Sequence, residues 1–508
     1  MRLRIKAVAC GAIWLLVGTR AYAQGSPAEE IAKIVAAVKP GSMRMGIHVV
    51  ELPSGRTVYE LNAKDAFKPA SNMKLLTTAA ALDLLPPNFR YTTTLAVKDD
   101  NLIVLGTGDP SLGDPRLAKE AGQPITAMFH EWAAKLQEKG ITEIKGDLII
   151  DDTVFEAQQY NPNWPADQRQ NWYSAPVGGL NFNDNCIEVT VKPGKPGEPC
   201  VVEVTPPNTY TTIRNECRTG NAQKPAISRV GDQPVYVVSG TCKSAGTLQS
   251  VAVPDAGLFF ASAMRTALAA KGIRIHGQIR RARVRDDRGN LPPEYATIAV
   301  YERPLTDLLG RINKNSQNLF AECLLKTIGF QVSWRDGTPD VGSYESGRRY
   351  VDRFLTKTRA ARSPDLCIDD GSGYSHKNRV TPQLITSVLT YMARHPLRNT
   401  FADSLAVAGQ DGTLEKRMTD IRGQVRAKTG YIAGVHALSG YAGKLQGYPG
   451  RFAFSMLFNY VTVSGTEAHQ VQDQICRALV AAAERLPPPA RPATRPVIPL
   501  TRPAGLRP

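Results

Sequence analysis

Three short motifs occur once each in this chain, in a fixed order: Ser71-Asn72-Met73-Lys74, Ser316-Gln317-Asn318 and Lys428-Thr429-Gly430. The first two begin 245 residues apart, whereas the second and third begin 112 residues apart. Residues that act in one site must meet in space, and a compact core does not need so much chain between the first two motifs. The spacing therefore predicts a core that is discontinuous in sequence and interrupted by a large insertion.

The first motif is predicted to open a helix, because apolar residues follow it at helical spacing. The pair Pro86-Pro87 should end that helix. Ser71 and Lys74 would then lie on one face, one turn apart. There a neutral lysine amine can take the proton of a serine hydroxyl that attacks a carbonyl. Because an exposed lysine has a pKa of about 10.4, this role requires burial or a nearby positive charge, for which Lys428 is the candidate.

The other two motifs supply polar side chains suited to the same reaction. Ser316 is a candidate to relay a proton between Lys74 and a leaving amine. Asn318, predicted to begin a helix, can hydrogen-bond a substrate amide and hold the Lys74 side chain. Lys428 and Thr429 form a pair of a cation and a hydroxyl that suits a substrate carboxylate.

Gly430 follows a predicted strand over 424–428 and would let that strand approach a peptide substrate closely. The backbone N–H groups of Ser71 and Tyr431 are the candidates for an oxyanion hole. Taken alone, the first motif could be a helix start with a surface lysine, and the third could be a turn at a strand end. The three motifs together favour catalysis.

The first 23 residues are predicted to be an export signal. Positive residues at 2, 4 and 6 precede a mostly apolar stretch, and Ala21-Tyr22-Ala23 forms a small-x-small cleavage site. The apolar stretch is too short to span a bilayer. Export predicts an oxidising compartment, most simply the periplasm of a Gram-negative-type bacterium.

Seven of the eight cysteines follow the predicted signal, so at least one is unpaired or bridges two chains. Four of them lie in the middle of the chain, and we predict one disulfide there, Cys217–Cys242. The chain has no Cys-x-x-Cys, no His-Glu-x-x-His and no calcium-type carboxylate loop. We therefore expect neither a metal nor a cofactor.

The formal net charge of +16 overstates the charge of the folded body. The signal carries four positive charges, and residues 485–508 carry five arginines and no acid, which leaves about +7. This excess suits residence near anionic polymers of the cell envelope. Nucleic-acid binding is disfavoured by the export signal and by the lack of a basic stripe with interleaved aromatic residues.

We expect residues 24–90 and 294–486 to form one discontinuous catalytic domain. Residues 91–293 are rich in strand-like segments separated by Gly and Pro, with a helix around 124–139. They are predicted to form two nested accessory domains. Residues 487–508, rich in Pro and Arg, are predicted to be an extended, disordered tail.

The three motifs resemble the signature of penicillin-binding proteins and serine β-lactamases. Further stretches narrow the resemblance to the D-alanyl-D-alanine carboxypeptidase/endopeptidase family of class C low-molecular-mass penicillin-binding proteins. These stretches are Pro69-Ala70-Ser71, Gly108-Asp109-Pro110-Ser111-Leu112, Asn163-Trp164-Pro165, Ser174-Ala175-Pro176, Asp370-Gly371-Ser372-Gly373 and Ala408-Gly409-Gln410-Asp411-Gly412-Thr413-Leu414. The resemblance implies an α/β (α+β) fold: a β-lactamase/transpeptidase-like serine enzyme domain with a large, mainly β insertion forming two accessory domains.

The resemblance also implies an activity. Ser71 would attack the penultimate D-Ala carbonyl of a peptidoglycan stem peptide, and water would hydrolyse the acyl-enzyme. Release of D-Ala is carboxypeptidase activity, and release of a cross-bridged amine is endopeptidase activity. Penicillins should acylate the same serine, and a homodimer is plausible within the family.

The chain departs from the family pattern at two places. Tyr431 stands where Ser or Thr commonly follows Lys-Thr-Gly. After Asp370-Gly371-Ser372-Gly373 the family often has an arginine near a substrate carboxylate, whereas this chain has His376 and Lys377. His376 is a candidate substrate contact that would depend on pH. The segment at Asp370 could equally be a structural loop, and 409–414 is interpreted as a turn and helix start.

Two alternatives remain open at this point. One is a β-lactamase or esterase of the same fold; a class A β-lactamase would have its first two motifs much closer together and would need a Glu-bearing loop. The other is a non-catalytic cell-wall-binding homologue. The intact Ser71, Lys74, Ser316 and Lys428 argue against it, because a binding module has no use for an activated nucleophile.

Overall fold

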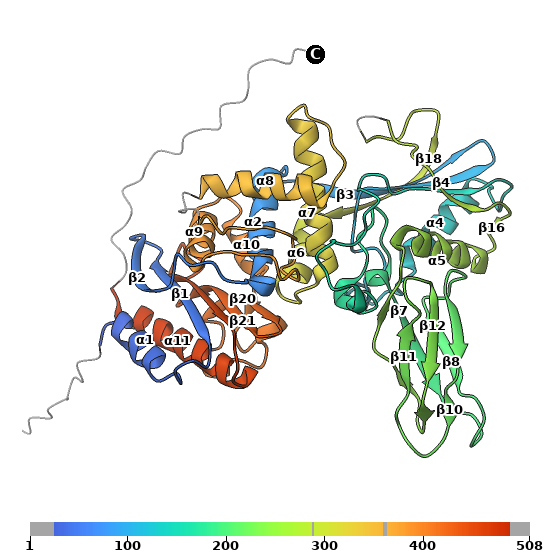
Figure 1. Ribbon diagram of the computed structural model, residues 1–508. Helices are drawn as coiled ribbons and strands as arrows, with labels where there is room; N and C mark the ends of the chain where they lie inside the picture. The colour runs from blue at the N-terminus through green and yellow to red at the C-terminus, as the bar shows by residue number, and fades with distance from the viewer. Residues whose placement is uncertain (1–24, 287–288, 359–362, 488–508) are drawn as a thin grey trace, which may run out of the picture.

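The computed structural model describes residues 25–286, 289–358 and 363–487. The predicted signal, 1–23, lies outside the described residues, as does the predicted tail beyond residue 487. The structure is a mixed α/β protein whose helix-covered first body lies beside a second, mainly β body (Figure 1). No helix within the described ranges is both long and apolar enough to cross a membrane.

The first body contains an antiparallel sheet of six strands in the order β19-β20-β21-β22-β1-β2. The strands are β1 (Arg44–Glu51), β2 (Arg56–Leu61), β19 (Ala406–Val407), β20 (Val425–Ile432), β21 (Val435–Ala442) and β22 (Phe452–Asn459). Every residue of β21 and β22 is buried, because helices cover both faces of the sheet. The register pairs Val50 with Ala453, so a strand from the N-terminal part of the chain lies beside one from the C-terminal part in the same sheet.

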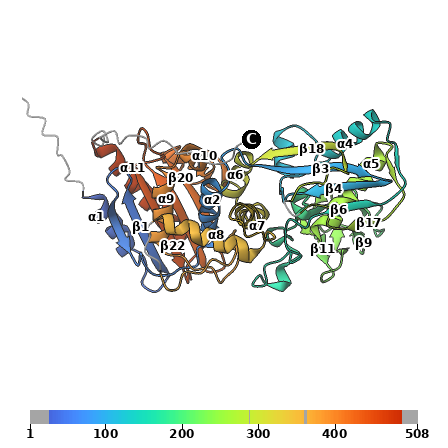
Figure 2. The ribbon, with the colours of Figure 1, turned by 90° about the horizontal axis from the view of Figure 1, so that it is seen from above.

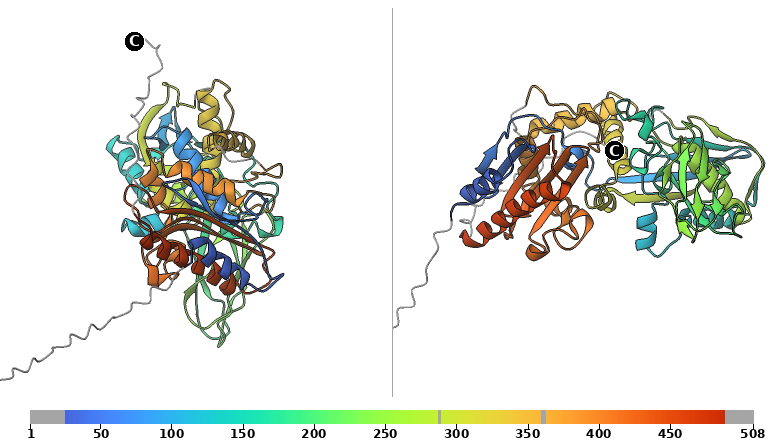
Figure 3. Two further views of the ribbon diagram at one scale, coloured as in Figure 1. Left: turned by 90° about the vertical axis from the view of Figure 1, so that its left-hand side faces the viewer. Right: turned by 60° about the horizontal axis from the view of Figure 1, so that its bottom comes forward.

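Helices α1 (Pro27–Ala36) and α11 (Gly465–Arg485) lie side by side on one face of this sheet (Figure 3), joined by an ion pair of 3.1 Å between Arg485 and Glu30. The other helices of this body lie on the opposite face. They are α2 (Met73–Leu84), α6 (Leu305–Asn313), α7 (Asn318–Arg335), α8 (Tyr344–Lys357), α9 (Pro382–Met392) and α10 (Arg398–Asp403).

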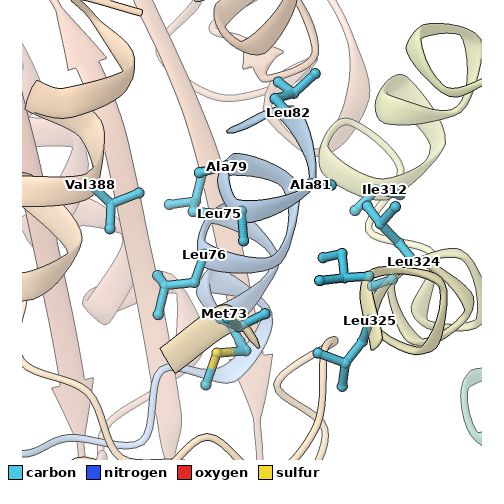
Figure 4. Packing of buried hydrophobic residues seen from close by; sticks show 14 of the residues in the cluster. Met73, Leu75, Leu76, Ala79, Ala81, Leu82, Ile312, Leu324, Leu325 and Val388 are labelled. Carbon is cyan, nitrogen blue, oxygen red and sulfur yellow. The ribbon is translucent and has the colours of Figure 1, made fainter. Parts of the chain in front are cut away.

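Helix α2 is the centre of the core on that face. All of its residues except Asp83 are buried, which is the pattern of a helix packed on all sides. Figure 4 shows Val388 of α9 on one side of α2, and Ile312 of α6 with Leu324 and Leu325 of α7 on the other. The packing holds the start of α2, where the first motif lies, against both neighbours.

The insertion begins where β3 (Arg90–Lys98) leaves the first body and ends where β18 (Ala296–Pro304) returns beside it. These two strands belong to a five-stranded sheet in the order β17-β6-β4-β3-β18 (Figure 2). Its other strands are β4 (Asn101–Gly106), β6 (Leu148–Asp151) and β17 (Ile279–Arg281). Three helices and a two-stranded parallel pair complete this part: α3 (Pro115–Glu120), α4 (Ala127–Glu138), α5 (Ala256–Ala270), β5 (Glu143–Ile144) and β16 (Arg274–Ile275).

Within the insertion, residues 186–252 form a smaller all-β part that projects from it at the lower right of Figure 1. Its strands are β7 (Cys186–Lys192), β8 (Val201–Thr205), β9 (Thr212–Asn215), β10 (Arg218–Thr219), β11 (Ala226–Arg229), β12 (Val235–Ser239), β13 (Thr241–Cys242), β14 (Gly246–Thr247) and β15 (Val251–Ala252). The mainly β character predicted for this stretch of chain is therefore observed.

The predicted Cys217–Cys242 disulfide is wrong for the described residues, where all seven cysteines carry free thiols. A third thiol, that of Cys200, lies beside both residues, so three thiols gather where the sequence predicted one pair. Burial raises the pKa of both Cys217 and Cys242, and so does a contact that each makes with Cys200. Each of the two predicted partners thus has Cys200 as a neighbouring thiol.

Buried polar contacts join the insertion to the first body. Arg311 of α6 donates to Asp114 at 2.7 and 2.8 Å and to Asp184 at 3.1 Å. Gln317, inside the second motif, donates to the same Asp184 at 2.9 Å. Arg311 is 8% exposed and Asp114 is 1% exposed, so the charges compensate one another away from water.

We expect Arg311→Met to destabilise the protein by about 3–5 kcal/mol, because it leaves buried carboxylates without a cation. The measurement is the midpoint of thermal and denaturant unfolding. The control is Arg477→Met, which breaks an exposed pair with Asp420 and should cost about 1 kcal/mol or less. Equal effects of the two substitutions would contradict this account of the interface.

Candidate active site

Ser71 lies in a single 3₁₀ turn, Ala70–Asn72, directly before α2. Ala70 has a left-handed φ of 45°, a strained backbone conformation for a residue other than glycine. A Cβ at Gly373 would lie 1.8 Å from the Ala70 carbonyl oxygen, so only glycine fits there. Asn72 donates to the Lys428 carbonyl at 3.1 Å. Packing from two other segments therefore holds Ser71 in place.

Lys74 is fully buried and donates three hydrogen bonds. Its Nζ lies 2.9 Å from Ser71 Oγ, 2.7 Å from Asn318 Oδ1 and 2.9 Å from the Ser372 carbonyl oxygen. Burial lowers the pKa of Lys74 to about 7, against the opposing charges of Glu322 and Asp370. Near neutral pH a large fraction of this amine is therefore unprotonated and can accept the proton of Ser71.

Ser316 and Lys428 face each other across the same site. Lys428 Nζ donates to Ser316 Oγ at 2.8 Å and to the Thr429 carbonyl at 2.8 Å. Burial, and then the charge of Lys74, hold the pKa of Lys428 well below its usual value. Of the two causes that the sequence allows for a low pKa of Lys74, burial and a nearby positive charge, burial is the main one.

The third motif lies inside a strand rather than at its end. β20 continues to Ile432, four residues past the expected end at Lys428, because pairing with β21 extends as far as Val435. A Cβ at Gly430 would lie 3.0 Å from both the Pro69 carbonyl oxygen and Asn72 Nδ2. Glycine therefore lets this strand pack directly against the turn that carries Ser71.

An open cleft of about 510 Å³ runs past Ser71. Ser316, Asn318, Thr429, Gly430, Tyr431 and His376 also line it, as do Gln168, Trp172, Tyr173, Asn315, Gly373, Tyr374, Thr413, Ile432 and Ala433. The structure thus brings the predicted site residues to one cleft or, for Lys74 and Lys428, directly beneath it. No group of three or more potential metal ligands occurs among the residues that the model describes.

Tyr431 and His376 are the least enclosed of the predicted residues. The Tyr431 side chain is 68% exposed, and its ring lies 5.1 Å from that of His436. Burial lowers the pKa of His376, and the charges of Lys68 and Arg379 lower it further. A neutral imidazole at pH 7 can hydrogen-bond to a substrate carboxylate but brings no positive charge to it.

Asp370 has the structural role that the sequence left open. Its carboxylate accepts from the Gly373 N–H at 2.7 Å, the Ser375 N–H at 2.6 Å and Asn378 Nδ2 at 2.8 Å. Trp164 Nε1, from the insertion, donates to it at 2.9 Å. The residue thus shapes the loop that presents a carbonyl to Lys74.

Three groups at the site were missed from the sequence. Thr413 accepts from the Thr429 hydroxyl at 2.8 Å; it lies in the stretch interpreted as a turn and helix start. The Tyr173 carbonyl, from the insertion, accepts from Asn318 at 2.7 Å, and no side-chain pattern could have indicated a backbone contact. Glu322 lies four residues after Asn318, a helical spacing that could have revealed it.

Comparison with known proteins decides the family. The family model described as "D-Ala-D-Ala carboxypeptidase 3 (S13) family" matches residues 28–482. The chain belongs to this family. It is therefore a serine peptidase, as the motifs predicted, and the predicted resemblance is confirmed.

Two relatives illustrate the similarity. A D-alanyl-D-alanine carboxypeptidase of Actinomadura sp. (strain R39) is 30% identical over 463 residues, which cover 85% of this chain and 80% of the relative. The D-alanyl-D-alanine carboxypeptidase DacB of Haemophilus influenzae is 25% identical over 451 residues, 84% of this chain and 88% of the relative.

A solved structure supports the fold. The crystal structure of penicillin binding protein 4 (dacB) from Haemophilus influenzae has a TM-score of 0.70 and 24% identity, covering 88% of this chain and 97% of the other. A second crystal structure of that protein, complexed with a β-lactam, gives a TM-score of 0.67. The likeness extends over the insertion as well as the helix-covered sheet and confirms the predicted fold class.

The rate of acylation by a fluorescent penicillin should rise with pH through about 7, because Lys74 accepts a proton only after losing its own. The measurement is the second-order rate constant between pH 5 and 9 at constant ionic strength. Lys74→Met should abolish the pH-dependent rise together with nearly all labelling. A flat profile for the unmodified protein would contradict the assignment of Lys74 as the base.

Proposed function

We propose that this protein is an exported serine D-Ala-D-Ala carboxypeptidase that also cleaves D-Ala-containing cross-links of peptidoglycan. The observation that carries the proposal is the 2.9 Å hydrogen bond between Ser71 Oγ and the Nζ of a fully buried Lys74. A serine hydroxyl that is hydrogen-bonded to a buried amine at the edge of an open cleft is an activated nucleophile. Family membership supplies the substrate class.

The reaction follows from the contacts around Ser71. Ser71 Oγ attacks the carbonyl carbon of the penultimate D-Ala while Lys74 takes the hydroxyl proton. The C–N bond then breaks, and the proton passes through Ser316 to the departing amine. Water next attacks the ester and gives its proton to Lys74, and Lys74 passes that proton to Ser71 Oγ as the C–O bond to Ser71 breaks. The two steps return Ser71 and Lys74 to their starting protonation.

The substrate would lie along the edge of β20 as an added strand. In that position the backbone N–H groups of Ser71 and Tyr431 are the proposed oxyanion hole. Asn318 would donate to a substrate amide. Thr429, with Thr413 beside it, would bind the carboxylate of the leaving residue in the field of Lys428.

The openness of the cleft favours both activities. A carboxypeptidase releases one D-Ala, whereas an endopeptidase must also accommodate a second stem peptide beyond the bond that it cleaves. Tyr431, exposed at the rim of the cleft, is a candidate to contact that second stem. His376 is proposed as a hydrogen-bonding group for a substrate carboxylate at the cleft wall.

The proposed function includes a division of the chain into domains and a cellular location. Residues 24–90 and 294–486 are proposed as the catalytic domain and 91–293 as two nested accessory domains. The buried contacts of Arg311 and Trp164 support a fixed attachment of the insertion to the catalytic domain. A periplasmic location rests on the signal-like first 23 residues, and a homodimer stays a prediction of the resemblance.

Monomeric and cross-linked muropeptides test the activity directly. We expect loss of one D-Ala from the monomer and conversion of the cross-linked dimer to two monomers, both identified by mass. Ser71→Ala should lower both rates by about 10³-fold or more, because the nucleophile is removed.

Ser26→Ala is the control, since this serine caps α1 and does not line the cleft. Unchanged turnover by the Ser71 variant would refute the mechanism. Rapid release of hydrolysed penicillin, with no action on muropeptides, would instead identify a β-lactamase. Absence of both labelling and turnover would identify a non-catalytic homologue.

A further inference from the structure

Glu322 is a fully buried carboxylate beneath the active site that no motif accounts for. It lies on α7, one turn after Asn318, and is 0% exposed. None of the ion pairs among the described residues involves it. A buried carboxylate without a cation in contact is expensive in free energy and is rarely kept without a role.

The polar contacts of Glu322 all go to one loop. Its two oxygens accept from the Gly371 N–H at 2.9 Å and the Ser372 N–H at 2.7 Å. A Cβ at Gly371 would lie 2.7 Å from the Ala321 carbonyl oxygen, so glycine allows the loop to approach α7 this closely. The carboxylate therefore clamps two consecutive peptide groups.

Helix α2 holds the same two residues from the opposite side. The Gly371 carbonyl accepts from Thr77 Oγ1 at 2.8 Å, and the Ser372 carbonyl accepts from Lys74 Nζ at 2.9 Å. One of the three acceptors of the catalytic amine is thus the carbonyl of a residue whose N–H is bound by Glu322, while Asp370 binds the N–H of the next residue, Gly373. Loss of the bonds to Glu322 would release the residue that carries this acceptor.

On the basis of the proposed function, we propose that Glu322 is a positioning residue for the acylation step. It holds the Gly371 and Ser372 N–H groups and so fixes the position of the residue whose carbonyl accepts from Lys74. Glu322 touches neither the substrate nor Ser71, so it acts through Lys74 and the loop.

Several titratable groups surround Lys74 and Glu322. Glu322 from α7 and Asp370 from the loop favour the protonated amine, while burial disfavours it. Lys428 from β20 is the neighbouring lysine, and burial and the charge of Lys74 lower its own pKa. Burial and Asp370 raise the pKa of Glu322 to about 8, and its two backbone donors oppose that rise. Lys326 of α7 is the other lysine whose charge interacts with Glu322.

The test is the pH profile of acylation by a fluorescent penicillin in the full-length protein carrying Glu322→Gln. The plateau rate should fall, because an amide offers one carbonyl oxygen in place of two acceptors and one of the two loop N–H groups loses its partner.

Thr77→Val separates orientation from charge. It removes the hydroxyl that holds the Gly371 carbonyl but changes no charge, so the plateau should fall with the limb in its original place. The matched control is Glu156→Gln, which removes the partner of the buried Lys326 on the same helix. This control should lower the melting temperature and leave the profile unchanged.

Each outcome supports the inference or overturns it. If Glu322→Gln is folded and its plateau rate equals that of the unmodified protein, the positioning role of Glu322 is refuted. If Glu322→Gln does not fold, Thr77→Val decides the orientation role, and an unchanged plateau refutes it. Failure of the unmodified protein to be acylated would overturn the proposed function itself, which is a distinguishable result.

Discussion

The structure depends on keeping one lysine amine out of water. Lys74 sits at the start of a helix that is buried on every side, and its Nζ reaches Ser71, Asn318 and the Ser372 carbonyl. Burial lowers the pKa of the amine to about 7, and three acceptors from three segments fix its position. Two further contacts hold these acceptors, because the Tyr173 carbonyl accepts from Asn318 and Glu322 accepts from the Ser372 N–H.

The insertion contributes directly to this arrangement. The Tyr173 carbonyl orients Asn318, Trp164 donates to Asp370, and Asp184 holds Gln317 within the second motif. The chain between the first two motifs is therefore more than a spacer. A substitution in the insertion can change catalysis by releasing one of these contacts, even at a distance from Ser71.

Much of the fold and of the candidate site could be predicted from the sequence. The motif order and spacing predicted the family and a β-rich insertion, and helical spacing correctly placed Ser71 next to Lys74. The prediction of a Cys217–Cys242 disulfide was wrong, because spacing along the chain does not reveal that Cys200 lies beside both thiols. The third motif was expected at the end of a strand over 424–428, whereas pairing with β21 continues the strand to Ile432.

The sequence by itself determined the chemistry of this protein: a serine, two lysines, a second serine and an asparagine, in an order and spacing that indicate acyl transfer. Only the tertiary structure decided what makes that chemistry possible. The low pKa of Lys74, the clamp of Glu322 on the loop at 371–372 and the carbonyl of Tyr173 all arise from contacts between segments at least 49 residues apart in sequence. Burial and backbone contacts are properties of the folded chain, and no local pattern of residue types encodes them.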